Sequence, residues 1–121
     1  MRAVIKDDLG GDVRSYARRF DSLKRRGVKV HLRGKISSSA TMFLGLPNVV
    51  IGPKAVFRFH SPYATNFFGR AFVWHFRNMT AHRLPPNLRR EYLRSWGRKA
   101  EFTQLTAQEI VALEPSIKIR K

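Results

Sequence analysis

The sequence predicts an α/β fold, in which a helix connects neighbouring strands, and three observations lead to that class. Residues 2–9, RAVIKDDL, alternate as a short strand does, and VKVHL at 28–32 alternates again. Between these two segments apolar residues recur at helical spacing, which predicts a helix. A strand, a helix and a second strand make a βαβ unit, which is typical of layered α/β proteins.

The first helix is expected to begin after Gly10-Gly11, because a glycine pair breaks the preceding strand. Asp12 can cap this helix, and Gly27 ends its pattern. Its polar face is almost entirely Arg and Lys. Its apolar positions are Val13, Tyr16, Ala17, Phe20 and Leu23.

The segment GKISSSATMFLG, residues 34–45, places three serines directly before an apolar run. A serine there can be a helix N-cap, because its hydroxyl satisfies a free backbone N–H of the first turn. It can also be a nucleophile at a helix N-terminus, where negative charge is stabilised. ATMFLGL at 40–46 predicts a short buried helix that Pro47-Asn48 stop, and the alternating or apolar segments 49–52 and 55–60 predict two further strands.

The second half of the chain is expected to be mainly helical. The pattern predicts a helix over 66–83, an amphipathic helix that Gly97 ends, and a late helix that starts with a capping box from Thr106 to Glu109. SIKIR, residues 116–120, is either a last strand or a docking tail. The length suits one domain over 1–121, with a strand and helix core in 1–62 and a helical part in 63–121.

The charge points to polyanionic neighbours. Twenty-four Lys and Arg against eight Asp and Glu give a net charge of +16, which favours nucleic acid or another polyanion as a partner. The chain has no cysteine, so it has no disulfide or thiolate metal site. No apolar run reaches the roughly 18 residues of a membrane span, and the start lacks the apolar core of a secretory signal. We therefore expect a protein of the cytoplasm or of a larger particle.

Three features of the first 60 residues can share one chemistry. Gly10-Gly11 and Ser39 each follow a predicted strand and open a helix, and His60 ends a later strand. His60 is a candidate general base, and Ser39 is a candidate nucleophile. The backbone N–H groups of Gly11 and Ala40 are candidate donors to an oxyanion.

These segments resemble the ClpP/crotonase superfamily, and in particular its Clp protease branch. The shared order is strand, GG, helix, strand, G-x-x-x-S, helix, PN, strand and H-x-P. Here it reads LGGDV, GKISSSATMF, LPNVV and FRFHSP, and QLTAQEIVALEP weakly matches the late helix of that family. The resemblance implies a ClpP-like βαβ layered fold, Ser39 as nucleophile, His60 as general base, and Gly11 and Ala40 as oxyanion donors.

Two departures from the family pattern affect the expected site and the expected assembly. The family's catalytic Asp precedes the late helix, but this chain has RSWGRKAEF there, so Glu101 is the nearest acid and a weak third member. A Ser-His dyad, or a backbone carbonyl that orients His60, are the alternatives. The family's N-terminal strands and helix are also expected to be missing, which would expose a sheet edge that a homo-oligomer or a larger assembly covers.

Several other residues have side chains capable of catalysis, metal binding or contact with a partner. Lys35 could form a Ser-Lys dyad with Ser39, although it is expected to point into the turn. His31, His75 and His82 are expected to be packing or surface residues, because their spacing makes no metal site. The aromatic run 67–76 is expected to serve the core or a subunit interface. We expect no cofactor and no metal.

Three functions remain open on the sequence alone. The first is a serine-peptidase-like hydrolase of peptides or proteins, active or degenerate. The second is a non-catalytic module of the same fold, such as a phage or other assembly component, that binds nucleic acid or an acidic assembly through its basic surface. The third is a crotonase-like acyl-CoA enzyme, which would leave the serine and His60 without a role.

Overall fold

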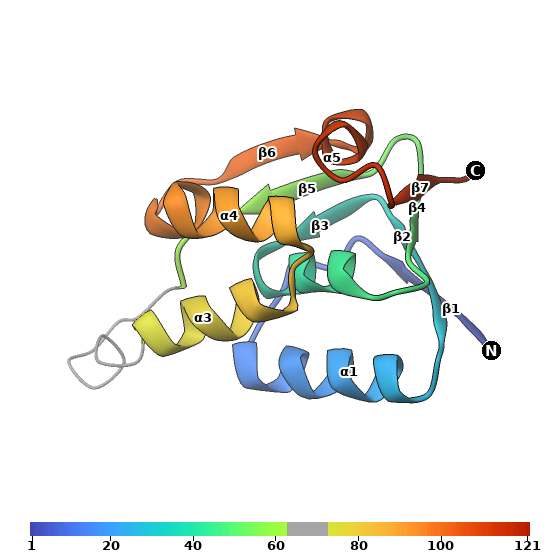
Figure 1. The fold of residues 1–121 in the computed structure, drawn as a ribbon, viewed down its shortest axis with the longest axis horizontal. Coiled ribbons are helices and arrows are strands. Elements are labelled where there is room, and N and C mark those ends of the chain that lie inside the picture. Colours follow the sequence, from blue (N-terminus) through green and yellow to red (C-terminus); the bar gives the residue numbers. More distant parts are fainter. Residues whose placement is uncertain (63–72) are drawn as a thin grey trace.

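A computed structural model describes residues 1–62 and 73–121, and it contains two small sheets (Figure 1). The larger sheet has the strand order β1-β2-β4-β7, and all of its neighbouring strands run parallel. Helix α1 (Val13–Arg25) connects β1 to β2, so the expected βαβ unit is present. The strands of this sheet are β1 (Arg2–Lys6), β2 (Lys29–Arg33), β4 (Val50–Ile51) and β7 (Lys118–Ile119).

The smaller sheet has the order β3-β5-β6. Strand β3 runs parallel to β5, and β5 runs antiparallel to β6. Gly34 alone separates β2 from β3, so one stretch of chain passes from the larger sheet into the smaller one (Figure 1). The strands are β3 (Lys35–Ser37), β5 (Val56–Phe59) and β6 (Thr103–Thr106).

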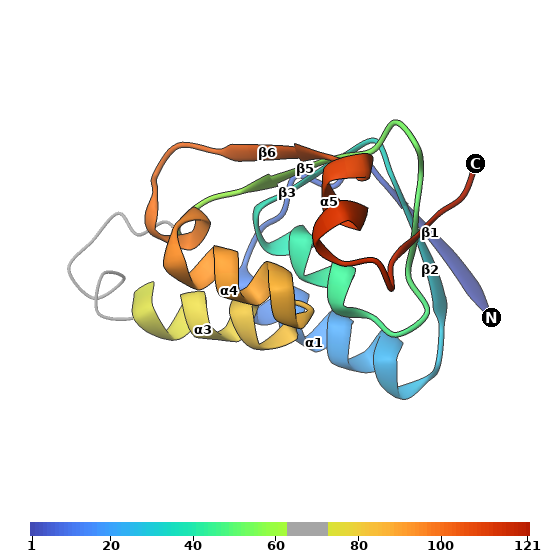
Figure 2. The same ribbon diagram turned by 45° about the horizontal axis from the view of Figure 1, so that its top comes forward.

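The helices gather on one side of the smaller sheet. In Figure 2, β3, β5 and β6 lie along the top of the molecule, with α3, α4 and α1 below them. The core lies between these layers and includes the fully buried Phe43, Phe57 and Phe59. Besides α1, the helices of the described residues are the 3₁₀ segments η1 (Ser38–Gly45) and η2 (Trp96–Arg98) and the α-helices α3 (Val73–Arg83), α4 (Pro86–Arg94) and α5 (Ala107–Leu113).

The expected α/β class with parallel strands is confirmed, and several details are corrected. The first strand ends at Lys6, and η1 begins at Ser38 as a 3₁₀ helix. Strand β6 was not predicted, because its four residues run directly into the capping box of the late helix and carry no clear strand alternation of their own. The capping box of α5 and the helix over 73–83 are confirmed, whereas the rest of the expected helix, 66–72, lies outside the described residues.

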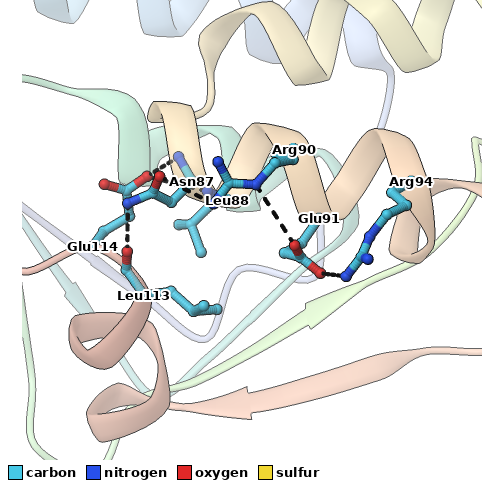
Figure 3. Close-up of polar contacts among 7 residues, drawn as sticks. All are labelled: Asn87, Leu88, Arg90, Glu91, Arg94, Leu113 and Glu114. Carbon is cyan, nitrogen blue, oxygen red and sulfur yellow. Dashed lines mark hydrogen bonds and ion pairs between the residues drawn. The ribbon is translucent and has the colours of Figure 1, made fainter.

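Glu114 joins α5 to α4 through a buried cap (Figure 3). Its side chain is only 5% exposed, and its Oε1 atom accepts hydrogen bonds from the backbone N–H groups of Asn87 and Leu88, the latter at 3.1 Å. The Asn87 amide in turn donates to the carbonyl of Leu113 at 2.8 Å. A carboxylate at a helix N-terminus satisfies free N–H groups and interacts favourably with the helix dipole, so Glu114 fixes how α4 starts.

Within the described part of the chain, no helix has both the length and the apolar character needed to cross a membrane.

Candidate functional site

The ends of two parallel strands bring Ser38 and His60 together. Ser38 follows β3, His60 comes directly after β5, and the two strands are neighbours that finish at the same edge of the smaller sheet. The Nε2 atom of His60 lies 2.9 Å from the hydroxyl oxygen of Ser38, which is hydrogen-bond distance. A serine hydroxyl paired with an imidazole is the basic unit of nucleophilic catalysis by serine.

The backbone of Ser38 adopts a conformation that L-residues seldom adopt. Its φ angle is 59°, in the left-handed region, at the turn where β3 gives way to η1. Such a conformation costs of order 1 kcal/mol or more and persists only where the surroundings hold it. Ser38 is half-buried, so its hydroxyl is held in place without being sealed in the core.

Ser39, the serine expected to be the nucleophile, is held elsewhere. It is only 3% exposed, and its hydroxyl accepts a hydrogen bond from the Gly11 N–H at 2.9 Å and donates one to the Gly11 carbonyl at 3.0 Å. The expected pairing of Ser39 with His60 is therefore replaced by a pairing of Ser38 with His60. The signal was present in the sequence, because G-x-x-x-S counted from Gly34 ends on Ser38.

The glycine loop lies directly against these serines. Gly10 has a φ of +86°, and a Cβ atom placed on it would lie 2.7 Å from the Ser37 carbonyl oxygen and 2.8 Å from the Ser38 Cβ. Only glycine allows this approach without strain. The N–H of Ser37 also donates to the carbonyl of Asp8 at 2.9 Å, which ties the loop to β3.

Asp8, which the sequence did not single out, organises the loop. Its Oδ1 atom accepts hydrogen bonds from the Gly10 N–H at 3.0 Å and from the Tyr16 hydroxyl at 2.6 Å. Burial, reinforced by the hydrogen bond to Asp8, raises the pKa of Tyr16 to about 12. The phenol therefore stays protonated and continues to donate to Asp8 at physiological pH.

The expected oxyanion donors are placed differently from one another. The Gly11 N–H already donates a hydrogen bond to the Ser39 hydroxyl. Ala40 is completely buried inside η1. With Ser38 at the centre, the N–H that follows the hydroxyl-bearing residue belongs to Ser39, and the Ser39 nitrogen lies 3.1 Å from the position of a Cβ on Gly10.

An aromatic ring lies beside His60. The antiparallel register pairs Phe59 with Thr103, so one step further His60 faces Phe102, and their ring centroids are 4.5 Å apart. Glu101 has an exposed side chain and takes part in neither the hydrogen bond nor the ring contact of His60. Among the residues described, the ring of Phe102, and not the carboxylate of Glu101, lies against the imidazole of His60.

The surroundings of His60 favour its neutral form. Burial lowers its pKa below the ordinary value of 6.5, and the nearby Arg58 guanidinium lowers it further. Arg58 is held there by the Phe102 ring, because its guanidinium carbon lies 3.9 Å from the ring centroid. A neutral imidazole at physiological pH can accept a proton, as a general base must.

The remaining candidates lie away from this site. His31 is buried in β2, where burial and then Arg33 lower its pKa, and its Nε2 atom has no hydrogen-bond partner among the described residues. His75 and His82 are exposed on α3, and the Lys35 side chain is exposed. In residues 1–62 and 73–121 no three His, Cys, Asp or Glu side chains gather closely enough to hold a metal ion.

Comparisons with known proteins add no family to this geometry: no protein-family model and no curated protein matches the chain.

Proposed function

We propose that this protein is a serine hydrolase of peptide or related acyl bonds, with Ser38 as nucleophile and His60 as general base. The observation that carries the proposal is the 2.9 Å contact between His60 Nε2 and the Ser38 hydroxyl at the shared edge of β3 and β5. The lowered pKa of His60 and the left-handed backbone at Ser38 support it, because both are costs that a purely structural contact does not need.

The chemistry follows from the pair. With the imidazole proton on Nδ1, the Ser38 hydroxyl donates to Nε2, and His60 takes that proton as the Ser38 oxygen attacks the acyl carbon. The resulting imidazolium then donates its proton to the leaving group. Water, activated by the same imidazole, releases the acyl group in the second half of the reaction.

The Ser39 hydroxyl acts as a stand-in for an oxyanion in this proposal. This hydroxyl accepts the hydrogen bond of the Gly11 N–H. The backbone N–H of Ser39 directly follows Ser38 in the chain and lies beside Gly10. A developing oxyanion that displaced the Ser39 hydroxyl would gain two backbone donors, from Gly11 and Ser39. Because no carboxylate faces His60 among the described residues, we expect a slow enzyme.

The resemblance to the ClpP/crotonase superfamily supports this function and is part of the proposal. With the serine placed at Ser38, the G-x-x-x-S spacing from Gly34 agrees with the motif, and His60 keeps its H-x-P context. We extend the proposal to assembly as a homo-oligomer or within a larger particle, because β1 is an edge strand of its sheet.

Active-site labelling with a fluorophosphonate, read by intact mass, tests the function. We expect the wild-type protein to gain one adduct, and we expect Ser38→Ala and His60→Ala to gain none. Ser39→Ala is the matched control, because it removes a hydroxyl one residue away and frees the Gly11 N–H, so its labelling should persist.

Circular dichroism would establish that each variant is folded before its labelling is compared. A folded wild-type protein that takes no label would contradict the proposal. Loss of labelling in Ser39→Ala together with full labelling of Ser38→Ala would return the nucleophile to Ser39.

A second candidate is binding of nucleic acid or another polyanion, and helix α1 favours it. Its solvent face carries the exposed side chains of Arg14, Arg18, Lys24 and Arg25. Binding by such a face would weaken steeply with salt, because each phosphate contact releases counterions. A titration of a fluorescent duplex at several salt concentrations tests it, and a flat salt dependence would exclude this mode.

A further inference from the structure

A pocket lies at the carboxyl edge of the larger sheet. It has a volume of about 510 Å³ and is lined by Lys6, Arg33, Gly34, Gly52, Pro53, Lys54, Ala55 and Lys121. Lys6 and Arg33 are the last residues of β1 and β2, and the remaining cations follow β4 and β7. The carboxyl ends of parallel strands are the usual place for ligands in open α/β sheets, and this volume falls in the range of small-molecule sites.

Among the described residues, four cations and no acidic residue line the pocket. Lys6 and Arg33 are direct partners in the parallel register of β1 and β2, and like charges opposite one another destabilise a sheet. None of the four lining cations forms an ion pair in the described part of the chain. Asp7 lies beside Gly34, and its carboxylate accepts the Lys35 N–H at 2.9 Å, so one negative charge borders the four cations of the lining.

The lining is chemically divided. Four of the lining residues, Gly34, Gly52, Pro53 and Ala55, are uncharged and small or apolar, and the other four are cations. Arg33 leans across Gly52, since its Nε atom lies 3.9 Å from where a Cβ of Gly52 would be. A planar guanidinium binds phosphate through paired hydrogen bonds, and lysines add mobile point charges.

We propose that this pocket binds a phosphate-bearing ligand of nucleotide size, with two or more phosphate groups at the cations and its base against the uncharged lining residues. Four cations match a di- or triphosphate better than a single carboxylate, and the bound anion would relieve the repulsion between Lys6 and Arg33. The same phosphates could be presented by a free nucleotide or by a nucleic acid backbone.

This pocket is separate from the Ser38–His60 pair and does not depend on it. Gly34 and Ala55 stand immediately before β3 and β5, whereas Ser38 and His60 come directly after the same strands (Figure 1). The four steps from Gly34 to Ser38 along an extended chain span about 13 Å, so the two sites lie at opposite ends of one strand pair.

Calorimetric titration of the whole chain with ADP, without metal, tests the proposal. We expect the double variant Lys6→Gln/Lys54→Gln to bind ADP about tenfold more weakly or worse, because two charge-assisted contacts are lost. The matched control is Arg2→Gln/Lys29→Gln, which removes two exposed positive charges that are register partners at the other end of β1 and β2. The affinity of this control for ADP should stay within about twofold, because screening makes distant surface charges count little.

Equal weakening in both double variants would overturn the proposal, as would the absence of ADP binding by the wild-type protein. Competition with a short oligothymidylate then identifies the source of the phosphates. Displacement of ADP by the oligonucleotide would assign the pocket to a nucleic acid backbone, and its failure to compete would assign the pocket to a free nucleotide. Fluorophosphonate labelling of Ser38 should be the same in both double variants, so failure of one proposal is distinguishable from failure of the other.

Discussion

The cap at Glu114 and the pair at Ser38 and His60 are both polar contacts inside the fold, but they differ in how completely their partners are satisfied. Glu114 is buried, and one of its oxygens accepts two backbone N–H groups of α4 (Figure 3). Ser38 and His60 are half-buried and share one hydrogen bond. The backbone of Ser38 is left-handed, and the imidazole of His60 is partly removed from solvent, which lowers its pKa.

The difference separates polar groups that hold the fold from polar groups that are available for chemistry. A saturated buried carboxylate lowers the free energy of the native state, and removing it leaves backbone donors unpaired. A strained serine beside a neutral histidine adds little stability, but in the proposed function the two side chains exchange a proton. Substitutions in the two regions should therefore change different measurements.

The largest loss of stability is expected at the cap. Glu114→Ala should lower the free energy of unfolding by about 3 kcal/mol, because two N–H groups of α4 lose a buried charged acceptor. Urea denaturation measures it. Glu114→Gln keeps an acceptor oxygen and should lose less than half as much, and the folded fraction of either variant should still take the fluorophosphonate label. Similar losses for the two variants would show that the charge, and not the hydrogen bonds, holds α4.

A smaller loss is expected at the glycine loop, and there function should fall as well. Gly10→Ala should cost about 2 kcal/mol and abolish labelling, because the new Cβ would overlap Ser37 and Ser38 at a φ of +86°. Gly27→Ala is the matched control, since Gly27 also has a positive φ of +64° but no atom lies within 4 Å of its Cβ position. That variant should lose about 1 kcal/mol and keep its labelling. Equal losses of stability in Gly10→Ala and Gly27→Ala would mean that backbone strain alone, without the overlap with Ser37 and Ser38, sets the cost at Gly10.

The smallest effect is expected in the pH dependence of the site. The labelling rate should rise with pH through the pKa of His60, below the ordinary 6.5, because only the neutral imidazole accepts the Ser38 proton. The same pKa makes His60 contribute stability that is complete above pH 6.5 and is lost as the pH falls, because the folded state disfavours the imidazolium.

Arg58 provides the variant that sharpens this pH prediction. Arg58→Gln should move the midpoint of labelling to higher pH, because the neighbouring positive charge is removed, while burial of His60 still keeps the midpoint below 6.5. Arg58→Lys keeps the charge and should leave the midpoint close to that of the wild-type protein. An unchanged midpoint in Arg58→Gln would show that burial alone sets the pKa of His60.

The sequence predicted much of the fold and part of the site. The periodicity of α1 and the capping box of α5 are local patterns, and both are confirmed. Strand β6 has only four residues, and its pairing with β5 joins segments that lie over 40 residues apart, so no local pattern announced it. His60 was predicted as a site residue from its place at a strand end, and this role stays a prediction. The three consecutive serines could not be separated by residue type, because each is an equally good cap or nucleophile.

The sequence by itself determined the α/β class, the strongly basic character and the segments that carry the glycine pair, the serines and His60. These properties depend on composition and on local spacing, and both are contained in the sequence itself. Only the tertiary structure decided that Ser38 faces His60 while Ser39 binds Gly11, and that Phe102 rather than Glu101 lies beside the imidazole. The physical reason is register: the direction of a side chain at the end of a strand depends on pairing with strands distant in sequence, and a shift of one residue turns it toward a different neighbour.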